Sequence, residues 1–223
     1  MMEIDARSTT PHLETYYSNR ASEYERVYDK PERQHELEWL RQRVPEIFRG
    51  RRVLEVACGT GYWTQFIARE AAHVHACDIN ESVLEIAREK PIAAGRVTFA
   101  RGDAITLEGA PGGCDAAFAG FWWSHVKKSE LAKFVGNLAA RLEPGAVVAI
   151  LDNNYAEGSS TPISRRDAEG NAYQMRKLAN GEQYEVLKNF PTAGELAEAV
   201  RPVASEARLE SLTYYWLLVF TLK

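Results

Sequence analysis

Short apolar runs alternate with amphipathic stretches along most of the chain after residue 51. Within the apolar runs there is no strict apolar–polar alternation, which is typical of parallel strands buried on both faces of a sheet. Strands that alternate with helices in this way predict an α/β fold, with a mainly parallel sheet covered by helices. The predicted strands are residues 53–57, 73–79, 97–100, 116–120 and 146–151, and the predicted helices between them are residues 62–71, 81–90 and 129–142.

Local signals mark where several of these elements begin and end. Asn80 and Ser129 precede predicted helices, and their side-chain oxygens are expected to cap them. Pro144-Gly145 follows the third of these helices and is expected to end it. Thr192 and Glu195 have the spacing of a capping box, which predicts a short helix directly after them.

The last third of the chain departs from the strand–helix alternation. Residues 207–213 and 216–222 are two predicted strands with almost nothing between them. Parallel neighbours need a crossover of a dozen or more residues, so these strands are expected to be antiparallel. Asn180-Gly181 lies between two alternating runs, which is typical of a hairpin turn. The sequence therefore predicts an inserted β-hairpin at about residues 172–189, as a cap near the rim of the main sheet.

Residues 1–50 are predicted to form a polar tail and a helical lid, and residues 51–223 the main domain. A second helix before the main domain has apolar residues on one face and is expected to end near Pro45. The aromatic residues with helical spacing in the lid are Tyr17, Tyr24 and Tyr28, and the apolar positions of the second helix are Leu37, Leu40 and Val44.

Composition narrows the possible classes of protein. A chain of 223 residues with 45% hydrophobic and 26% charged residues suits one domain with its own core and a small cap. The formal net charge of −4 argues against nucleic-acid binding, which normally needs a basic excess. No apolar run approaches the roughly 18–20 residues of a membrane span. We expect a monomer or a homodimer that acts on a small molecule.

Cysteine and histidine usage adds two expectations. Cys58, Cys77 and Cys114 lack the spacing of a disulfide framework or a zinc site, which predicts free thiols in a cytoplasmic protein. His73, His75 and Cys77 share one strand face, but a solvated or helix-covered face explains this pattern better than ligation does, and we expect no metal.

The polar residues that follow successive strands are expected to meet at one rim, because ligands of open α/β sheets bind at the carboxyl ends of the strands. Gly59 and Gly61 allow a tight turn and close backbone approach to a ligand. Asp78, after the second strand, can accept hydrogen bonds from both hydroxyls of a ribose. Asp103, after the third, can accept one from an adenine amine. Together with Glu55, three acids at this rim suit an adenosine without phosphates, which carboxylates would repel.

In combination, Glu55–Gly61, Asp78-Ile79 and Gly102–Ala104 resemble the motif series of class I S-adenosylmethionine-dependent methyltransferases. The closing antiparallel pair resembles the reversed strands that end their seven-stranded, Rossmann-like sheet. The segment from Tyr16 to Tyr24 is similar to the N-terminal lid helix of the ubiquinone/menaquinone-biosynthesis-like, small-molecule branch. One departure is Ala57, which stands where the family has the first glycine of its turn. The resemblance implies that cofactor binding survives this methyl group, with altered contact to the methionine part.

The resemblance implies a role for each matching residue. Glycines make room for the methionine moiety, Glu55 braces the turn, Asp78 takes the ribose, and Phe121 lies beside the sulfonium. Without a ligand, the same positions would serve as a tight turn, a helix cap at Asp78 and an Asx-turn at Asp103. The cofactor-binding residues implied in this way are Tyr24, Glu55, Ala57, Gly59, Gly61, Asp78, Ile79, Asp103, Ala104 and Phe121.

Aromatic side chains from the lid and after the fourth strand are expected to line the acceptor pocket, where they can hold an aromatic or apolar molecule and a sulfonium. His125 lies at the same rim and is the candidate general base for a proton on the acceptor. The alternative is a packed or solvated loop histidine that orients the backbone. The expected acceptor-binding residues are Tyr16, Tyr17, Trp122, Trp123 and Asn153.

The function predicted from these residues is methyl transfer from S-adenosylmethionine to a small, aromatic or apolar molecule, on an O, N or C nucleophile. Two alternatives remain. A nicotinamide-dependent oxidoreductase would need a small residue where Thr64 stands. A non-catalytic protein with the same fold would bind the cofactor without transferring the methyl group.

Overall fold

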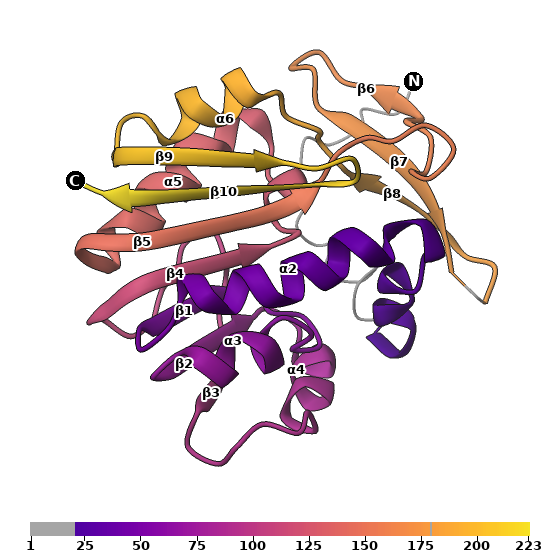
Figure 1. The fold of residues 1–223 in the computed structure, drawn as a ribbon. Helices are drawn as coiled ribbons and strands as arrows, with labels where there is room; N and C mark the ends of the chain where they lie inside the picture. The colour runs from indigo at the N-terminus through magenta and orange to yellow at the C-terminus, as the bar shows by residue number, and fades with distance from the viewer. Residues whose placement is uncertain (1–20, 179) are drawn as a thin grey trace.

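The computed structural model describes residues 21–178 and 180–223 and contains a seven-stranded sheet and a smaller three-stranded sheet (Figure 1). The seven strands lie in the order β3-β2-β1-β4-β5-β10-β9, and all are parallel except β10, which is antiparallel to both β5 and β9. The predicted fold class and the antiparallel closing pair are therefore confirmed. The strands are β1 (Arg52–Val56), β2 (His73–Asp78), β3 (Val97–Arg101), β4 (Cys114–Gly120), β5 (Leu142–Asn153), β9 (Ala204–Ser211) and β10 (Tyr215–Leu222).

Helices cover both faces of the large sheet, and each face has its own core. On one face the core includes Leu40, from the helix that crosses the front of the sheet in Figure 1, packed with Phe118 of β4. On the other it includes Phe134 packed with Ile150 of β5. Burial on both faces explains why the central strands are apolar without alternation. The helices are α2 (Gln34–Ile47), α3 (Thr64–Glu70), α4 (Glu81–Arg88), α5 (Leu131–Ala140) and α6 (Ala193–Val200).

The predicted hairpin is present and belongs to the second sheet, in the order β6-β7-β8. It consists of β7 (Ala172–Lys177) and β8 (Gln183–Leu187), with β6 (Arg165–Arg166) paired to the outer side of β7. This sheet lies beyond the carboxyl ends of β4 and β5 (Figure 1). It therefore stands at the rim where the sequence placed a cap.

The N-terminal segment reaches the same rim through two 3₁₀ helices, η1 (Ala21–Tyr28) and η2 (Pro31–Arg33). The Tyr28 ring stacks on Tyr62, with 3.6 Å between ring centroids, which fixes the end of η1 against the first strand–helix turn. Pro45 lies inside the last turn of α2, which ends at Ile47, so the prediction that the helix ends near Pro45 is confirmed to within two residues. The lid residues Tyr16 and Tyr17 lie outside the described residues, as does the side chain of Tyr24.

Some predicted boundaries are corrected by backbone geometry. Helix α5 ends at Ala140, and Pro144-Gly145 lies within β5 instead of ending the helix. The pairing of β4 with β5 shifts register between Cys114 and Ala116. Proline donates no ladder hydrogen bond, and Gly145 has a φ of +76°, so this pair forms an irregularity inside a strand.

Two of the three predicted helix caps are absent. The side chain of Asn80 makes no capping bond, and its backbone N–H instead donates to Asp78 Oδ1 at 2.9 Å. The hydroxyl of Ser129 donates to Glu169 and does not cap α5. The capping box is confirmed, because Thr192 and Glu195 exchange side-chain and backbone hydrogen bonds at the start of α6.

The structure also answers the expectations on cysteines and membrane spans. Cys58, Cys77 and Cys114 are buried free thiols, as predicted. Across residues 21–178 and 180–223, every helix is too short or too polar to cross a bilayer. In that same part of the chain, no three His, Cys, Asp or Glu side chains gather as a metal site would require.

Candidate functional site

The turn between β1 and α3 is shaped by left-handed backbone at three positions. Ala57, Gly59 and Gly61 have φ values of +52°, +56° and +74°. A Cβ at Gly61 would lie 3.0 Å from the Cβ of Ala87 in α4, so this position excludes side chains by space as well as by conformation. At Gly59 and Gly61 the turn therefore has no side chains that would cover its backbone at the carboxyl end of β1.

Ala57 occupies the position where the resembling family has glycine, and its positive φ explains that preference. A non-glycine residue in the left-handed region costs roughly 1–2 kcal/mol. We expect Ala57→Gly to raise the free energy of unfolding by about 0.5–1 kcal/mol in urea denaturation, net of the greater unfolded-state entropy of glycine. Ala146→Gly, at a buried position within β5, is the control and should destabilise. If Ala57→Gly instead lowered the free energy of unfolding, the left-handed backbone of Ala57 would not be strained in the wild type.

Asp78 joins this turn to the start of α4. Its Oδ2 accepts from Gly59 N–H and its Oδ1 from Asn80 N–H, both at 2.9 Å. The carboxylate is half-buried at the end of β2. A carboxylate oxygen can accept two hydrogen bonds, one of which a ligand hydroxyl can supply.

The neighbouring loop after β3 is tied to the same edge, since Gly102 N–H donates to the Asp78 carbonyl at 3.0 Å. Asp103 Oδ1 accepts from the backbone N–H groups of Ile105 and Thr106, both at 2.8 Å, which is the Asx-turn weighed from the sequence. Ala104 is buried against the core. The carbonyl of Ile79 accepts from Arg101 Nε at 3.0 Å.

Glu55 is a buried acid directly beneath the turn, with 2% of its surface exposed. Burial and, to a smaller extent, the nearby Asp78 carboxylate raise the pKa of Glu55 to about 8, against an opposing effect of the Thr64 side chain. Its Oε2 has no hydrogen-bond partner among the described residues. An uncharged, incompletely bonded carboxyl at this point is available to a polar group that binds in the turn.

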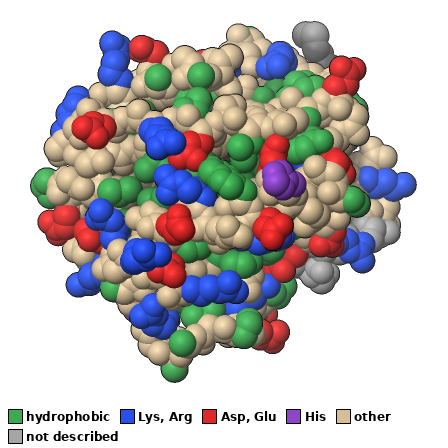
Figure 2. Space-filling view, viewed as in Figure 1, with side chains coloured by type: hydrophobic (Ala, Val, Ile, Leu, Met, Phe, Trp, Pro, Cys, Tyr) green, Lys and Arg blue, Asp and Glu red, His purple; other side chains and the backbone are tan. Residues whose placement is uncertain are grey.

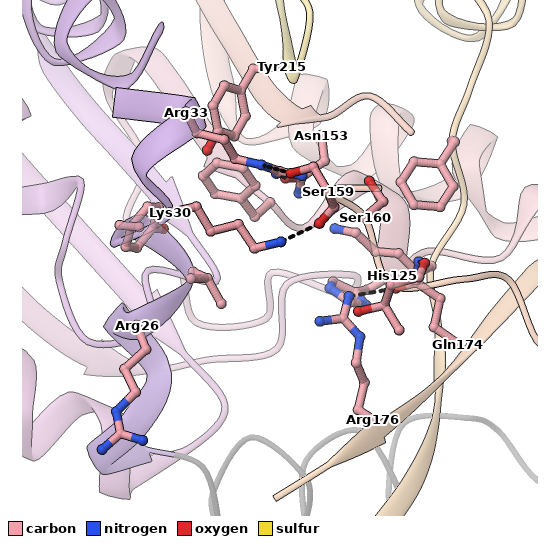
Figure 3. A pocket seen from close by; sticks show the side chains of 16 residues that line it. Arg26, Lys30, Arg33, His125, Asn153, Ser159, Ser160, Gln174, Arg176 and Tyr215 are labelled. Atoms are coloured by element: carbon pink, nitrogen blue, oxygen red, sulfur yellow. Dashed lines mark hydrogen bonds between the residues drawn. The ribbon is translucent and has the colours of Figure 1, made fainter. Parts of the chain in front are cut away.

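A cavity of about 230 Å³ opens beside the turn, between the rim of the large sheet, η1, η2 and the second sheet. Figure 3 shows side chains from all of these elements converging on it. Three predicted site residues line it: Phe121, His125 and Asn153. Phe121 has a φ of +60°, which is rare for a bulky residue and occurs chiefly where a site requires it.

Arg33 forms one wall of the cavity and is only 5% exposed. Its guanidinium donates to Ser159 Oγ at 2.9 Å and to Asn153 Oδ1 at 3.1 Å. The same group lies 5.6 Å from the ring centroid of Tyr215. Arg33 therefore links the N-terminal segment, the end of β5 and the loop before β6.

At the opposite wall, where Lys188 lines the cavity, a buried ion pair connects the second sheet to the large one. Lys188 Nζ lies 3.0 Å from Asp152 Oδ1 and donates to Ser124 Oγ at 2.6 Å. Asp152 is fully buried and also accepts from Ser124 N–H at 2.9 Å. Burial works against its charge, but Lys188 and these N–H groups hold the pKa of Asp152 below its usual range.

His125 sits against this pair and is also buried. Its Nδ1 lies 2.7 Å from the carbonyl oxygen of Leu187, so Nδ1 carries the proton and the ring is an Nδ1–H tautomer. Burial, with Lys188 close by, lowers the pKa of His125 to about 3. The neutral imidazole can accept a hydrogen bond through Nε2, but it holds a proton weakly.

Among the other predicted acceptor residues, the structure separates Trp123 from the cavity. Trp123 is 1% exposed and packs edge-to-face on Trp216 and Phe134 in the core. Its predicted role in the pocket wall is corrected to a core role. Trp122 is half-buried against the same core and is not among the lining residues of the cavity.

Sequence reasoning missed most of the polar wall of the cavity. These residues come from segments that carry no motif, and a local pattern does not reveal that a charged side chain will be buried. The missed lining residues include Lys30, Arg33, Ser159, Gln174, Arg176 and Lys188.

Comparisons with known proteins agree with this reading of the fold. Residues 53–145 match the family model described as "Methyltransferase domain". The chain is 25% identical over 155 residues to demethylmenaquinone methyltransferase of Staphylococcus aureus (strain MRSA252), an alignment that covers 67% of this chain and 64% of that protein. The chain thus spans slightly less than two thirds of the length of this curated relative.

Two solved structures share the whole architecture. One is described as a DhpI–SAH complex, with a TM-score of 0.80, 23% identity and 98% of both chains covered. Another is described as a DhpI–SAM–HEP complex, with a TM-score of 0.79, 24% identity and coverage of 97% of this chain and 99% of that one. At these identities the likeness shows the fold. The resemblance to class I methyltransferases is borne out by the family match and by the similarity to demethylmenaquinone methyltransferase, and the two structures add the shared fold.

Proposed function

We propose that this chain, which has the fold and motif series of the class I S-adenosylmethionine-dependent methyltransferases, transfers the methyl group of that cofactor to a small molecule bound in the cavity. When bound, S-adenosylmethionine supplies a methyl group already activated by its sulfonium. The main observation behind this proposal is that three features lie together at the carboxyl ends of the strands. They are the glycine turn at Gly59–Gly61, the Asp78 carboxylate and the cavity wall at Phe121. The match to the methyltransferase domain family supports the proposal.

The residues at the turn fit the cofactor. Gly59 and Gly61 leave the backbone accessible to the methionine part, and the unpartnered Oε2 of Glu55 offers a polar contact below it. Asp78 would hold the ribose hydroxyls. Asp103 would accept from the adenine amine through the oxygen that its Asx-turn does not use.

The chain's own residues would promote the transfer chiefly by alignment and exclusion of water. The walls at η1 and β7 enclose the acceptor, and Phe121 bounds the side that faces the turn. His125 would orient the acceptor as a hydrogen-bond acceptor through Nε2. The sequence suggested an aromatic or apolar acceptor, and the aromatic rings of the wall account for only part of the lining, because charged side chains contribute as much.

Asp78→Ala should weaken S-adenosylmethionine binding by about 1.5–3 kcal/mol, because it removes charged hydrogen bonds to two hydroxyls. Isothermal titration calorimetry measures this loss. Asp115→Ala is the matched control, since Asp115 accepts from Arg52 N–H at 2.7 Å at the opposite, amino end of β4. Equal affinities of wild type and Asp78→Ala would remove Asp78 from the cofactor site.

Methyl transfer itself is tested by incubating the protein with methyl-labelled cofactor and a metabolite extract. Labelled small molecules are the expected result. Binding of cofactor without any labelled product would favour the non-catalytic alternative. The nicotinamide alternative has little support, because β10 is reversed and Thr64 occupies the position that needs a small residue.

A further inference from the structure

The cavity wall has an unusual charge. Lys30 and Arg33 reach it from the N-terminal segment and Arg176 reaches it from β7, and none of the described residues that line it is an aspartate or a glutamate. In Figure 3 the three cationic groups lie around the same space. The whole chain is mildly acidic, with a net charge of −4, and the face drawn in Figure 2 carries basic and acidic side chains interspersed. The composition of the chain therefore does not explain why every lysine, arginine, aspartate or glutamate among the described lining residues is a lysine or an arginine.

Neutral oxygen atoms hold these cations in place. Lys30 Nζ donates to the carbonyl of Ser159, and Arg33 donates to the Ser159 hydroxyl. Arg176 Nη2 donates to Gln174 Oε1 at 2.5 Å. Carbonyl, hydroxyl and amide oxygens orient a cation without cancelling its charge, so these contacts leave the positive charges of Lys30 and Arg33 in the wall.

Two carboxylates, Asp152 and Glu32, lie near the cavity but are not among the described residues that line it. Asp152 is already paired with Lys188 inside the protein. Glu32 accepts from the Ser159 hydroxyl but is not part of the lining. Burial lowers the pKa of Lys30, the Arg33 guanidinium lowers it further, and Arg176 adds a smaller effect in the same direction, while Glu32 opposes them. The two arginines therefore repel the Lys30 ammonium, and Glu32 offsets part of that repulsion. An anion in the cavity would relieve this repulsion.

We propose that the acceptor is a small acid and that Lys30, Arg33 and Arg176 bind its oxyanion, a carboxylate or a phosphoryl group. Guanidinium groups match the planar, bidentate geometry of such oxygens, and a lysine adds a point charge. The cavity volume of about 230 Å³ lies below the roughly 300–1,000 Å³ of pockets that enclose drug-sized ligands, which restricts the acid to a small one. This inference deepens the proposed function and rests on it.

Calorimetric titration of the cofactor-free full chain tests the oxyanion site without relying on activity. The probes are inorganic phosphate, methylphosphonate and acetate, with acetamide as the neutral counterpart of acetate. At least one anion should bind about tenfold or more tightly than acetamide. Tighter binding of acetate assigns a carboxylate, and tighter binding of phosphate or methylphosphonate assigns a phosphoryl group.

Arg176→Met and, as an independent variant, Lys30→Met should each weaken binding of the preferred anion about tenfold or more. Arg201→Met is the control, because Arg201 carries the same charge on an exposed surface and its side chain is 76% exposed. Circular dichroism establishes that each variant is folded. The proposal is overturned if no anion binds better than acetamide, or if both cavity variants bind the anions as wild type does.

A parallel titration with S-adenosylmethionine separates the two hypotheses. Arg176→Met should leave cofactor affinity within about twofold of wild type, since Arg176 lies on the hairpin and not at the Gly59–Gly61 turn. Cofactor binding without anion binding would overturn only the oxyanion site. Anion binding without cofactor binding would support the oxyanion site and overturn the proposed function.

Discussion

Replacing Lys188 by methionine should lower the free energy of unfolding by about 3–5 kcal/mol, because it leaves the Asp152 charge buried without its cation. Asp152 is fully buried and Lys188 is 5% exposed, so water cannot solvate the carboxylate that remains. The Ser124 and Asn153 N–H groups would still donate to it, but they carry no net charge. Urea denaturation monitored by circular dichroism measures the loss.

Two further variants isolate the effect of the unpaired charge. Lys188→Met/Asp152→Asn should recover about 1 kcal/mol or more relative to Lys188→Met, because the amide can be buried at lower cost than the carboxylate. Lys128→Met is the matched control: it breaks the half-exposed pair with Glu195 and should cost about 1 kcal/mol or less. If Lys188→Met costs no more than Lys128→Met, the buried pair does not connect the two sheets as described.

This ion pair shows what the sequence could predict about the second sheet and what it could not. The Asn180-Gly181 turn and the alternation beside it depend on neighbouring residues, so the hairpin was found at about residues 172–189 and is confirmed as β7 and β8. The contact of Lys188 with Asp152 joins positions that are 36 residues apart. No local pattern encodes that pairing, and a lysine at the end of a strand usually lies in solvent.

The residues of the candidate site likewise fall into those that the sequence could predict and those that it could not. Residues at the ends of strands, such as Gly59 and Asp78, could be placed at the rim because parallel strands direct their carboxyl ends to one edge. Trp123 was misplaced because an aromatic residue after a strand can turn either into the core or toward the pocket, and only packing decides. Arg33 and Arg176 were missed because a cation lining a cavity has the same local sequence as one on the surface.

The buried histidine gives the second large effect, which depends on pH. In the unfolded chain an imidazole titrates near pH 6.5, whereas burial and Lys188 lower the pKa of His125 in the folded protein to about 3. A folded pKa below the unfolded one means that the unfolded state binds the proton more readily. His125 therefore costs no stability above about pH 6.5 and reduces stability as the pH falls below it, by about 1.4 kcal/mol per pH unit.

His125→Asn removes this titration while the amide can still donate to the Leu187 carbonyl. The difference in unfolding free energy between wild type and His125→Asn should fall by about 2 kcal/mol between pH 6.5 and pH 4.5. The pKa of Asp152 lies below its usual range, so that carboxylate stays charged throughout this interval and does not contribute to the slope. His35→Asn is the control, because His35 is exposed and its replacement shows any pH effect of a His-to-Asn substitution away from a buried site.

The same low pKa limits what His125 can do in methyl transfer. A proton taken from the acceptor would place a second positive charge beside Lys188, so the conjugate acid is disfavoured at neutral pH. The turnover of wild type and that of His125→Asn should therefore depend on pH in the same way between pH 6 and pH 8. The wild-type profile should show no additional inflection near pH 6.5. An inflection near pH 6.5 in the wild-type profile alone, together with a pH-independent difference in unfolding free energy between wild type and His125→Asn, would restore His125 as the general base. Its absence would leave an imidazole that orients an acceptor whose nucleophilic atom needs no base.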